Sequence, residues 1–170
     1  MNRSGPWPEG QTGNGVLIDT NLLVLLVVGL VNPRRIEAFK RTRQYTAADF
    51  RLLNAALDGF RPLYATPQIA AEVSNLTDLG GIERVAARNV LKTIVNEWTE
   101  PVVTSVAAVQ GRFYERLGLT DSAIQIVSSE KKCSVLTDDL DLYLALSRLG
   151  VPVYNFNHLR ERAWRITSRG

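Results

Sequence analysis

The sequence predicts an α/β protein with a central parallel sheet between two layers of helices, a three-layer α/β/α fold. The first observation is that short apolar runs alternate with amphipathic segments between residues 16 and 166, as expected when helices connect parallel strands. The second is that two apolar runs, at 16–18 and 134–137, lead directly into aspartates. The third is composition: 170 residues, of which 45% are hydrophobic and 22% charged, suffice for one core.

The chain begins with residues rich in Gly, Pro, Asn and Ser, so we expect 1–14 to be a flexible tail and 15–170 to be one domain. Residues 16–18 are predicted to form a buried strand. Residues 22–31 are almost entirely apolar and are predicted to form a helix packed on the sheet. This run is shorter than the ~20 residues that cross a bilayer, so we expect no membrane association.

Residues 34–59 are basic and helical in pattern, with a second helix starting near Thr46 and ending at Gly59. Residues 62–66 are predicted to be a short strand, and Thr66 caps a helix that has Pro67 in its first turn. A long amphipathic helix is expected over 82–98. The residues expected to face inward are Val85, Ala86, Val90, Ile94 and Val95.

A further helix is predicted over 106–117, with Gly118 ending it. Thr120 is a natural N-cap for the next helix, which runs to about residue 132. A strand at 134–137, a helix ending at Gly150, a strand at 151–154 and a helix at 157–166 complete the chain.

The low content of Cys and His excludes several classes of site. The chain has one Cys and one His, which leaves no intramolecular disulfide, no histidine-based triad or Cys–His pair beyond His158, and no His-rich zinc site. A single Cys favours a reducing, cytoplasmic location. The net charge of +3 is compatible with a polyanionic partner without requiring one.

Acidic residues recur where a parallel sheet places its ligands. Asp19 and the pair Asp138/Asp139 follow two different strands, so these carboxylates should meet at one edge. Asp121 begins the helix before the second of these strands, and Glu72 lies on the helix at 67–76. Clustered carboxylates repel one another, and a divalent cation relieves that repulsion. Oxygen ligands without His or Cys favour Mg²⁺ or Mn²⁺.

Each acid also has a structural interpretation. Asp19 is a good helix N-cap, Asp121 suits the first turn of a helix, and Glu72 alone could be a solvated helix residue.

Four motifs in order resemble those of PIN-domain nucleases, including the VapC-type toxins of toxin–antitoxin pairs. They are Ile-Asp-Thr-Asn at 18–21, Thr-Pro-Gln-Ile-Ala-Ala-Glu-Val at 66–73, Leu-Thr-Asp-Ser-Ala-Ile at 119–124 and Leu-Thr-Asp-Asp at 136–139. The resemblance covers roughly residues 16–156 and implies a metal-dependent endoribonuclease with a PIN-like fold. It also implies an RNA substrate, an antitoxin partner and a homodimer. The N-terminal tail and the long basic segment 34–59 depart from the compact toxins.

The resemblance also assigns residues. Asp19, Glu72 and Asp121 match the first three acidic positions, and Asp139 stands where relatives have the fourth, with adjacent Asp138 as the alternative. Metal ligands would then come from Asp19, Asp121, Asp139 and Asp138. Asn21 and Thr137 match supporting positions.

Two basic groups are candidates for RNA contact, and each could equally be an ordinary exposed face: Arg34 with Arg35, and Arg84 with Arg88. The competing hypothesis for the whole chain is an RNA-binding or partner-docking module with little or no turnover. A phosphotransfer domain fits less well, because only one acid follows the first strand and no Lys follows Val151.

Overall fold

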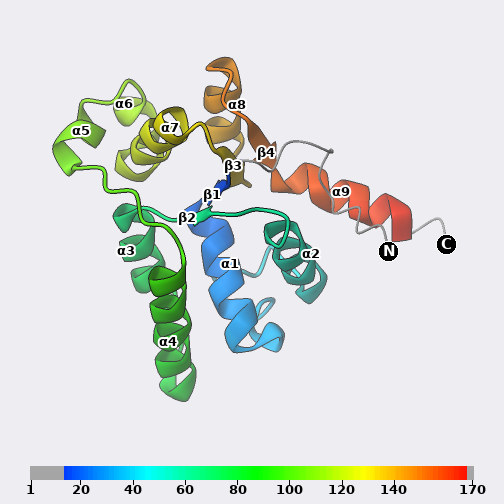
Figure 1. Ribbon diagram of the computed structural model, residues 1–170. Coiled ribbons are helices and arrows are strands. Elements are labelled where there is room, and N and C mark those ends of the chain that lie inside the picture. The colour runs from blue at the N-terminus through cyan, green and yellow to red at the C-terminus, as the bar shows by residue number, and fades with distance from the viewer. Residues whose placement is uncertain (1–13, 168–170) are drawn as a thin grey trace.

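The computed structural model describes residues 14–167 and contains a four-stranded, all-parallel sheet in the order β2-β1-β3-β4 (Figure 1). The predicted α/β architecture is therefore confirmed. Residues 1–13, which make up most of the predicted tail, lie outside the described residues. The strands are β1 (Val16–Ile18), β2 (Leu63–Tyr64), β3 (Ser134–Thr137) and β4 (Val153–Asn155).

Helices cover both sides of the sheet (Figure 1). α1 contacts α2, α3 and α4 in one group, while α7 and α8 pack on β3 in the other. The helices of the described residues are α1 (Thr20–Val31), η1 (Pro33–Arg35, a 3₁₀ turn), α2 (Ala47–Leu57), α3 (Pro67–Leu76), α4 (Gly81–Glu97), α5 (Ser105–Val109), α6 (Tyr114–Leu117), α7 (Leu119–Lys131), α8 (Leu140–Arg148) and α9 (Phe156–Thr167).

Helix α1 is the centre of the core. Its residues Leu22–Gly29 are all buried, as the apolar sequence predicts. A Cβ atom at Gly29 would lie 2.2 Å from the Phe50 ring, so α2 can pack this closely only because residue 29 has no side chain. The absence of a Cβ at Gly29 thus sets how closely α1 and α2 approach each other.

The register of the sheet brings distant acids to one edge. Ile18 pairs with Leu136, and the amide of Asp19 donates to the Leu136 carbonyl at 3.1 Å. The residues that follow β1 and β3 therefore leave the sheet side by side. The convergence predicted from the strand ends is present.

The prediction of one continuous helix over 106–117 is wrong. The chain forms two short helices, α5 and α6, with turns between them. Gly111 lies in this break, where a Cβ would come within 2.1 Å of Ser122 Oγ on α7. The chain bends here because it passes close to α7, which the local sequence pattern does not reveal.

The helical interpretation of 34–59 is also too broad, because only η1 and α2 are helical. Residues 36–46 form turns closed by Thr42, whose hydroxyl donates to the Ile36 carbonyl at 2.7 Å. Thr46 does cap α2, as predicted, through a reciprocal capping box with Asp49.

Of the residues of α4 expected to face inward, Ile94 is buried, whereas Val85 and Val95 are exposed. The buried residues Ala87 and Ile94 are seven positions apart and define the inner face of this helix. Val95 lies about 100° around the helix from Ile94, so it cannot share that face.

Candidate functional site

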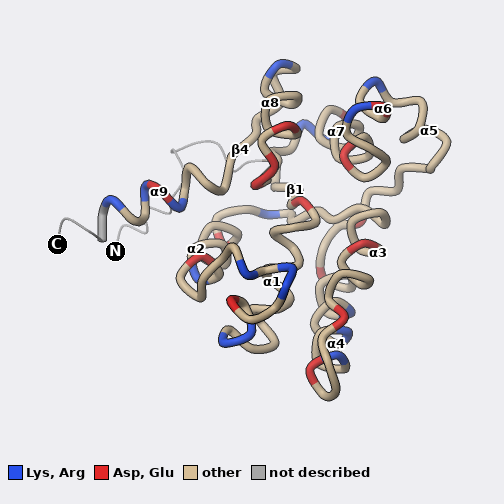
Figure 2. The backbone as a smooth tube through the Cα atoms, turned by 180° about the vertical axis from the view of Figure 1, so that it is seen from behind, with Lys and Arg blue, Asp and Glu red and all other residues tan. Residues whose placement is uncertain are grey.

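A pocket of about 300 Å³ lies at the carboxyl edge of the sheet, where β1 and β3 end. Four of its twelve lining residues carry carboxylates, and none of the twelve is basic. Acidic segments after β1, in α3 and α7 and at the base of α8 surround this region (Figure 2). The lining residues are Asp19, Thr20, Asn21, Glu72, Leu76, Leu117, Gly118, Leu119, Thr120, Asp121, Asp139 and Leu142.

Asp19 is the most buried acid of the site, with 4% of its surface exposed. It is the N-cap of α1: its Oδ1 accepts from the Leu22 amide at 2.9 Å. Its Oδ2 accepts from the Thr137 hydroxyl and from the Asp138 amide, the latter at 3.1 Å. Burial, followed by the nearby Asp138 charge, still raises the pKa of Asp19 well above its ordinary value. The structural interpretation as a cap and the placement at the pocket are both correct.

Glu72 reaches the pocket from the middle of α3 and is held by two hydroxyls. Thr20 donates to its Oε2 at 2.8 Å, and Thr120 donates to its Oε1. Glu72 is exposed, so these contacts orient the carboxylate toward α1 and α7 without burying it.

The hydroxyl of Thr120 does not cap α7 as predicted, because the N-cap is Gly118 and the helix begins at Leu119. Thr120 lies inside the helix and turns toward Glu72 instead. The sequence could not reveal this contact, because the two residues are 48 positions apart.

Asp121 lies in the first turn of α7 and lines the pocket. Burial, followed by the charges of Asp139 and Glu72, raises the pKa of Asp121 to about 7. The charges of Asp139 and Glu72 therefore lie close enough to make ionisation of Asp121 less favourable.

Asp139 and Asp138 have different roles in the structure. Asp139 lines the pocket and caps α8, accepting from the Leu142 amide at 2.9 Å. Its own amide donates to the Thr137 hydroxyl at 2.9 Å.

Asp138 is not among the lining residues. Its Oδ1 accepts from Asn21 at 3.3 Å, and its Oδ2 accepts from the Tyr45 hydroxyl. With both oxygens engaged, Asp138 is placed as a support, and Asp139 is the fourth acid of the pocket.

Tyr45 and Asn157 both donate hydrogen bonds to Asp138, and the sequence did not predict a role for either. Asn157 donates to the Asp138 carbonyl at 3.3 Å. The pKa of Tyr45 is raised above its ordinary value by burial and by Asp138, so the phenol stays protonated and donates. Neither residue carries a local signal, since Tyr45 and Asp138 are 93 positions apart.

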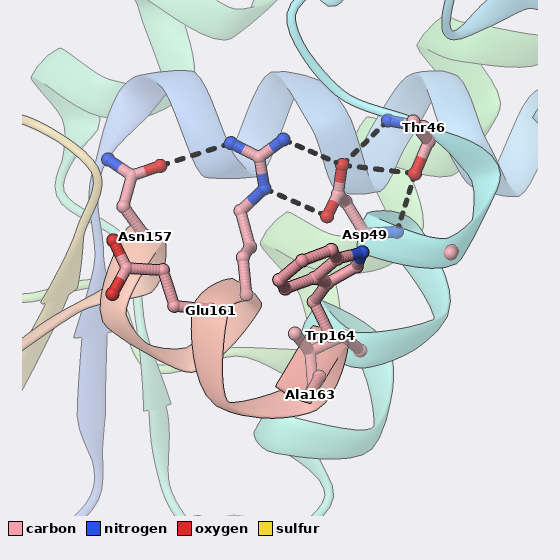
Figure 3. A pocket seen from close by; sticks show the side chains of 9 residues that line it. Thr46, Asp49, Asn157, Glu161, Ala163 and Trp164 are labelled. Carbon is pink, nitrogen blue, oxygen red and sulfur yellow. Dashed lines mark hydrogen bonds and ion pairs between the residues drawn. The ribbon is translucent and has the colours of Figure 1, made fainter. Parts of the chain in front are cut away.

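Arg160 on α9 binds Asn157 and Asp49, two of the side chains labelled in Figure 3. Its guanidinium binds the two oxygens of Asp49 at 2.8 and 3.0 Å and donates to Asn157 Oδ1 at 3.1 Å. It also lies over the Tyr45 ring, 5.5 Å from the centroid. The terminal helix thereby connects α2 to the residues beside Asp138.

None of the four arginines considered for RNA contact lines the acidic pocket. Arg35 forms an ion pair with Glu83 at 2.9 Å, and Arg84 forms one with Asp78 at 2.8 Å. Arg34 lies in η1 and Arg88 on α4, and both are exposed.

The donor chemistry of the pocket fits a hard divalent cation, because it offers carboxylate and hydroxyl oxygens and an uncompensated negative charge. The side chains themselves, however, are not arranged as a metal site. Among residues 14–167, no group of three or more His, Cys, Asp or Glu side chains is arranged to hold a metal ion. Binding of an ion would therefore require some of the pocket's carboxylates to reorient.

No protein-family model matches the chain, and no curated protein matches it either. Within residues 14–167, no helix is both long and apolar enough to span a bilayer.

Proposed function

We propose that this protein is a PIN-like, metal-dependent endoribonuclease that hydrolyses RNA phosphodiester bonds with Mg²⁺ or Mn²⁺. The observation that carries the proposal is the gathering of Asp19, Glu72, Asp121 and Asp139 in one pocket that has no basic lining residue. These acids come from the end of β1, from α3, from α7 and from the end of β3. Perturbed pKa values cluster at functional sites, and the pKa of Asp121 in this pocket is raised.

The residues divide into ligands and supports. Asp19, Asp121 and Asp139 would hold the ion, and Glu72, oriented by Thr20 and Thr120, would accept a proton from the attacking water. Thr137 and the Asp138 amide fix the rotamer of Asp19. A bound Mg²⁺ or Mn²⁺ would polarise a phosphate oxygen and lower the pKa of a bound water. The site would then need no histidine as a base.

A second candidate function is favoured by one observation, that the carboxylates do not form a complete ligand set within the described residues. On this alternative, the chain is an RNA-binding or partner-docking module without turnover. Binding of RNA without cleavage in Mn²⁺ would support it.

The experiment is incubation of a mixed-sequence RNA with the full chain in Mn²⁺, with and without chelator. We expect cleavage that chelator abolishes and that falls at least a hundredfold in Asp121→Asn. Asp78→Asn is the matched control, because it removes the same charge from an exposed acid that pairs with Arg84. Equal activity of Asp121→Asn and the wild type would refute the proposal.

A metal-binding measurement completes the test. Mn²⁺ should raise the melting temperature of the wild type and of Asp78→Asn, and should raise that of Asp121→Asn much less. The toxin role, the antitoxin partner and the homodimer rest on the resemblance alone and stay predictions. The cytoplasmic location rests on the single Cys and also stays a prediction.

A further inference from the structure

An ion pair joins two segments that adjoin the acidic pocket in sequence. Arg116, at the end of α6, contacts Asp141, in the first turn of α8, with Nη2 and Oδ1 3.0 Å apart. Arg116 directly precedes the lining residues Leu117–Leu119, and Asp141 lies between the lining residues Asp139 and Leu142. The guanidinium thus links α6 to the start of α8, two segments that each adjoin lining residues of the pocket in sequence.

This ion pair is exposed and therefore weak. The side chains of Arg116 and Asp141 are 47% and 71% exposed, and water screens such pairs strongly. The pair orients the guanidinium, yet another anion can take the place of Asp141 at small cost. An arginine held in this way differs from Arg160, whose partner Asp49 is largely buried.

The acidic pocket repels a polyanion, because four lining residues carry carboxylates and none is basic. A phosphodiester that enters needs a cation beside the acids. A guanidinium offers a planar pair of donors that matches two phosphate oxygens. Arg116 is adjacent in sequence to the pocket wall and is already oriented by a carboxylate.

We propose that Arg116 is the phosphate-binding residue of this pocket and that Asp141 is the anion it exchanges for an RNA phosphodiester. The inference rests on the proposed function, since it takes RNA as the ligand. It assigns Arg116 a contact with the backbone phosphate beside the acids, a contact that carries no base specificity. Asp141 occupies the guanidinium in the free protein and competes with RNA for it.

The test is equilibrium binding of a fluorescein-labelled, mixed-sequence single-stranded RNA, measured by anisotropy over a range of salt concentrations. Every arm carries Asp121→Asn, so that the RNA stays intact. The added variants are Arg116→Ala, Asp141→Ala, the double variant, and Arg112→Ala. Arg112 is the matched control, because it is an exposed cation of the same segment whose guanidinium lies over Phe113.

We expect Arg116→Ala to weaken binding about tenfold and to reduce the salt slope by about one. Asp141→Ala should strengthen binding about two- to fivefold, and this gain should vanish in the double variant. Arg112→Ala should weaken binding less than threefold, as expected for general charge loss.

Equal losses in Arg116→Ala and Arg112→Ala would overturn the assignment, as would a gain from Asp141→Ala that persists without Arg116. Failure of the nuclease proposal is seen separately, as absence of Mn²⁺-dependent cleavage by the wild type. If RNA binds with the expected Arg116–Asp141 coupling but is not cleaved, the nuclease proposal fails. The role of Arg116 then holds for a protein that binds RNA without turnover. Absence of any measurable RNA binding would overturn it on both functions.

Discussion

Thr137 donates its hydroxyl hydrogen bond to Oδ2 of Asp19, although the two residues are 118 positions apart in the chain. The same hydroxyl accepts from the Asp139 amide at 2.9 Å. One side chain at the end of β3 therefore orients the acid that follows β1 and the backbone of the acid that begins α8.

Replacing Thr137 with valine keeps the shape of the side chain and removes this hydroxyl. We expect the free energy of unfolding to fall by about 1–3 kcal/mol, because a buried carboxylate oxygen loses a donor. Urea denaturation measures the change. Thr137→Ser, which keeps the hydroxyl, should lose less, and a loss in Ser equal to that in Val would contradict the role of the hydrogen bond.

The raised pKa of Asp121 predicts a pH dependence of stability in the metal-free protein. The pKa is about 7 when folded and near 3.8 otherwise, so between these values the folded state binds more protons than the unfolded state. The contribution of Asp121 to the free energy of unfolding should therefore be greatest below about pH 4. It should fall as the pH rises to 7, by at most ~1.4 kcal/mol per pH unit.

Urea unfolding with chelator across pH 4–8 checks this dependence. Asp121→Asn should reduce the slope without abolishing it, because the raised pKa of Asp19 acts in the same direction. Asp78→Asn, whose acid lies outside the pocket, should retain the full slope. A wild-type profile whose slope is unchanged by Asp121→Asn would show that the carboxyl of Asp121 titrates normally.

The ion pair between Arg160 and Asp49 should matter more than its surface counterparts. Its side chains are only 29% and 12% exposed, so Arg160→Met leaves a poorly solvated carboxylate and should cost about 1–3 kcal/mol. Arg84→Met breaks the exposed pair with Asp78 and should cost less than about 0.5 kcal/mol. Thermal unfolding of both variants measures the difference, and equal costs would show that partial burial of Asp49 does not matter here.

Gly29→Ala tests the contact between α1 and α2. The added methyl would lie 2.2 Å from the Phe50 ring, so we expect a loss of about 1–3 kcal/mol despite the higher helix propensity of alanine. Gly80→Ala is the control, since no atom lies within 4 Å of the added Cβ. If Gly29→Ala were as stable as Gly80→Ala, α2 would have to be free to move outward.

The sequence predicts those parts of the structure that depend on short-range patterns. The strand ends at Asp19 and Asp138, the buried run of α1 and the cap at Thr66 all follow from neighbouring residues, and the register of parallel strands then brings the acids together. The sequence did not distinguish Asp138 from Asp139. That choice depends on Tyr45 and Asn21, which contact Asp138 across 93 and 117 positions.

Errors arose where packing overrides local preference. The break between α5 and α6 depends on the approach of Gly111 to Ser122, and the contact of Thr120 with Glu72 replaces the expected cap. Neither can be deduced from residues within one helical turn. Likewise, the periodicity of α4 allowed several apolar faces, and only its packing selects the one with Ala87 and Ile94.

The position of β1 between β2 and β3 has a consequence for biosynthesis. Of the four strands β1 is made first, yet one of its two neighbours, Ser134–Thr137, is translated only after β2 and helices α1 to α7. A nascent polypeptide on the ribosome therefore contains the apolar helix α1 before the sheet beneath that helix is complete. Exposed apolar surface of this kind is what chaperones bind and what drives aggregation, so we expect yield in cells to depend on chaperone supply more than the stability of the finished protein would suggest.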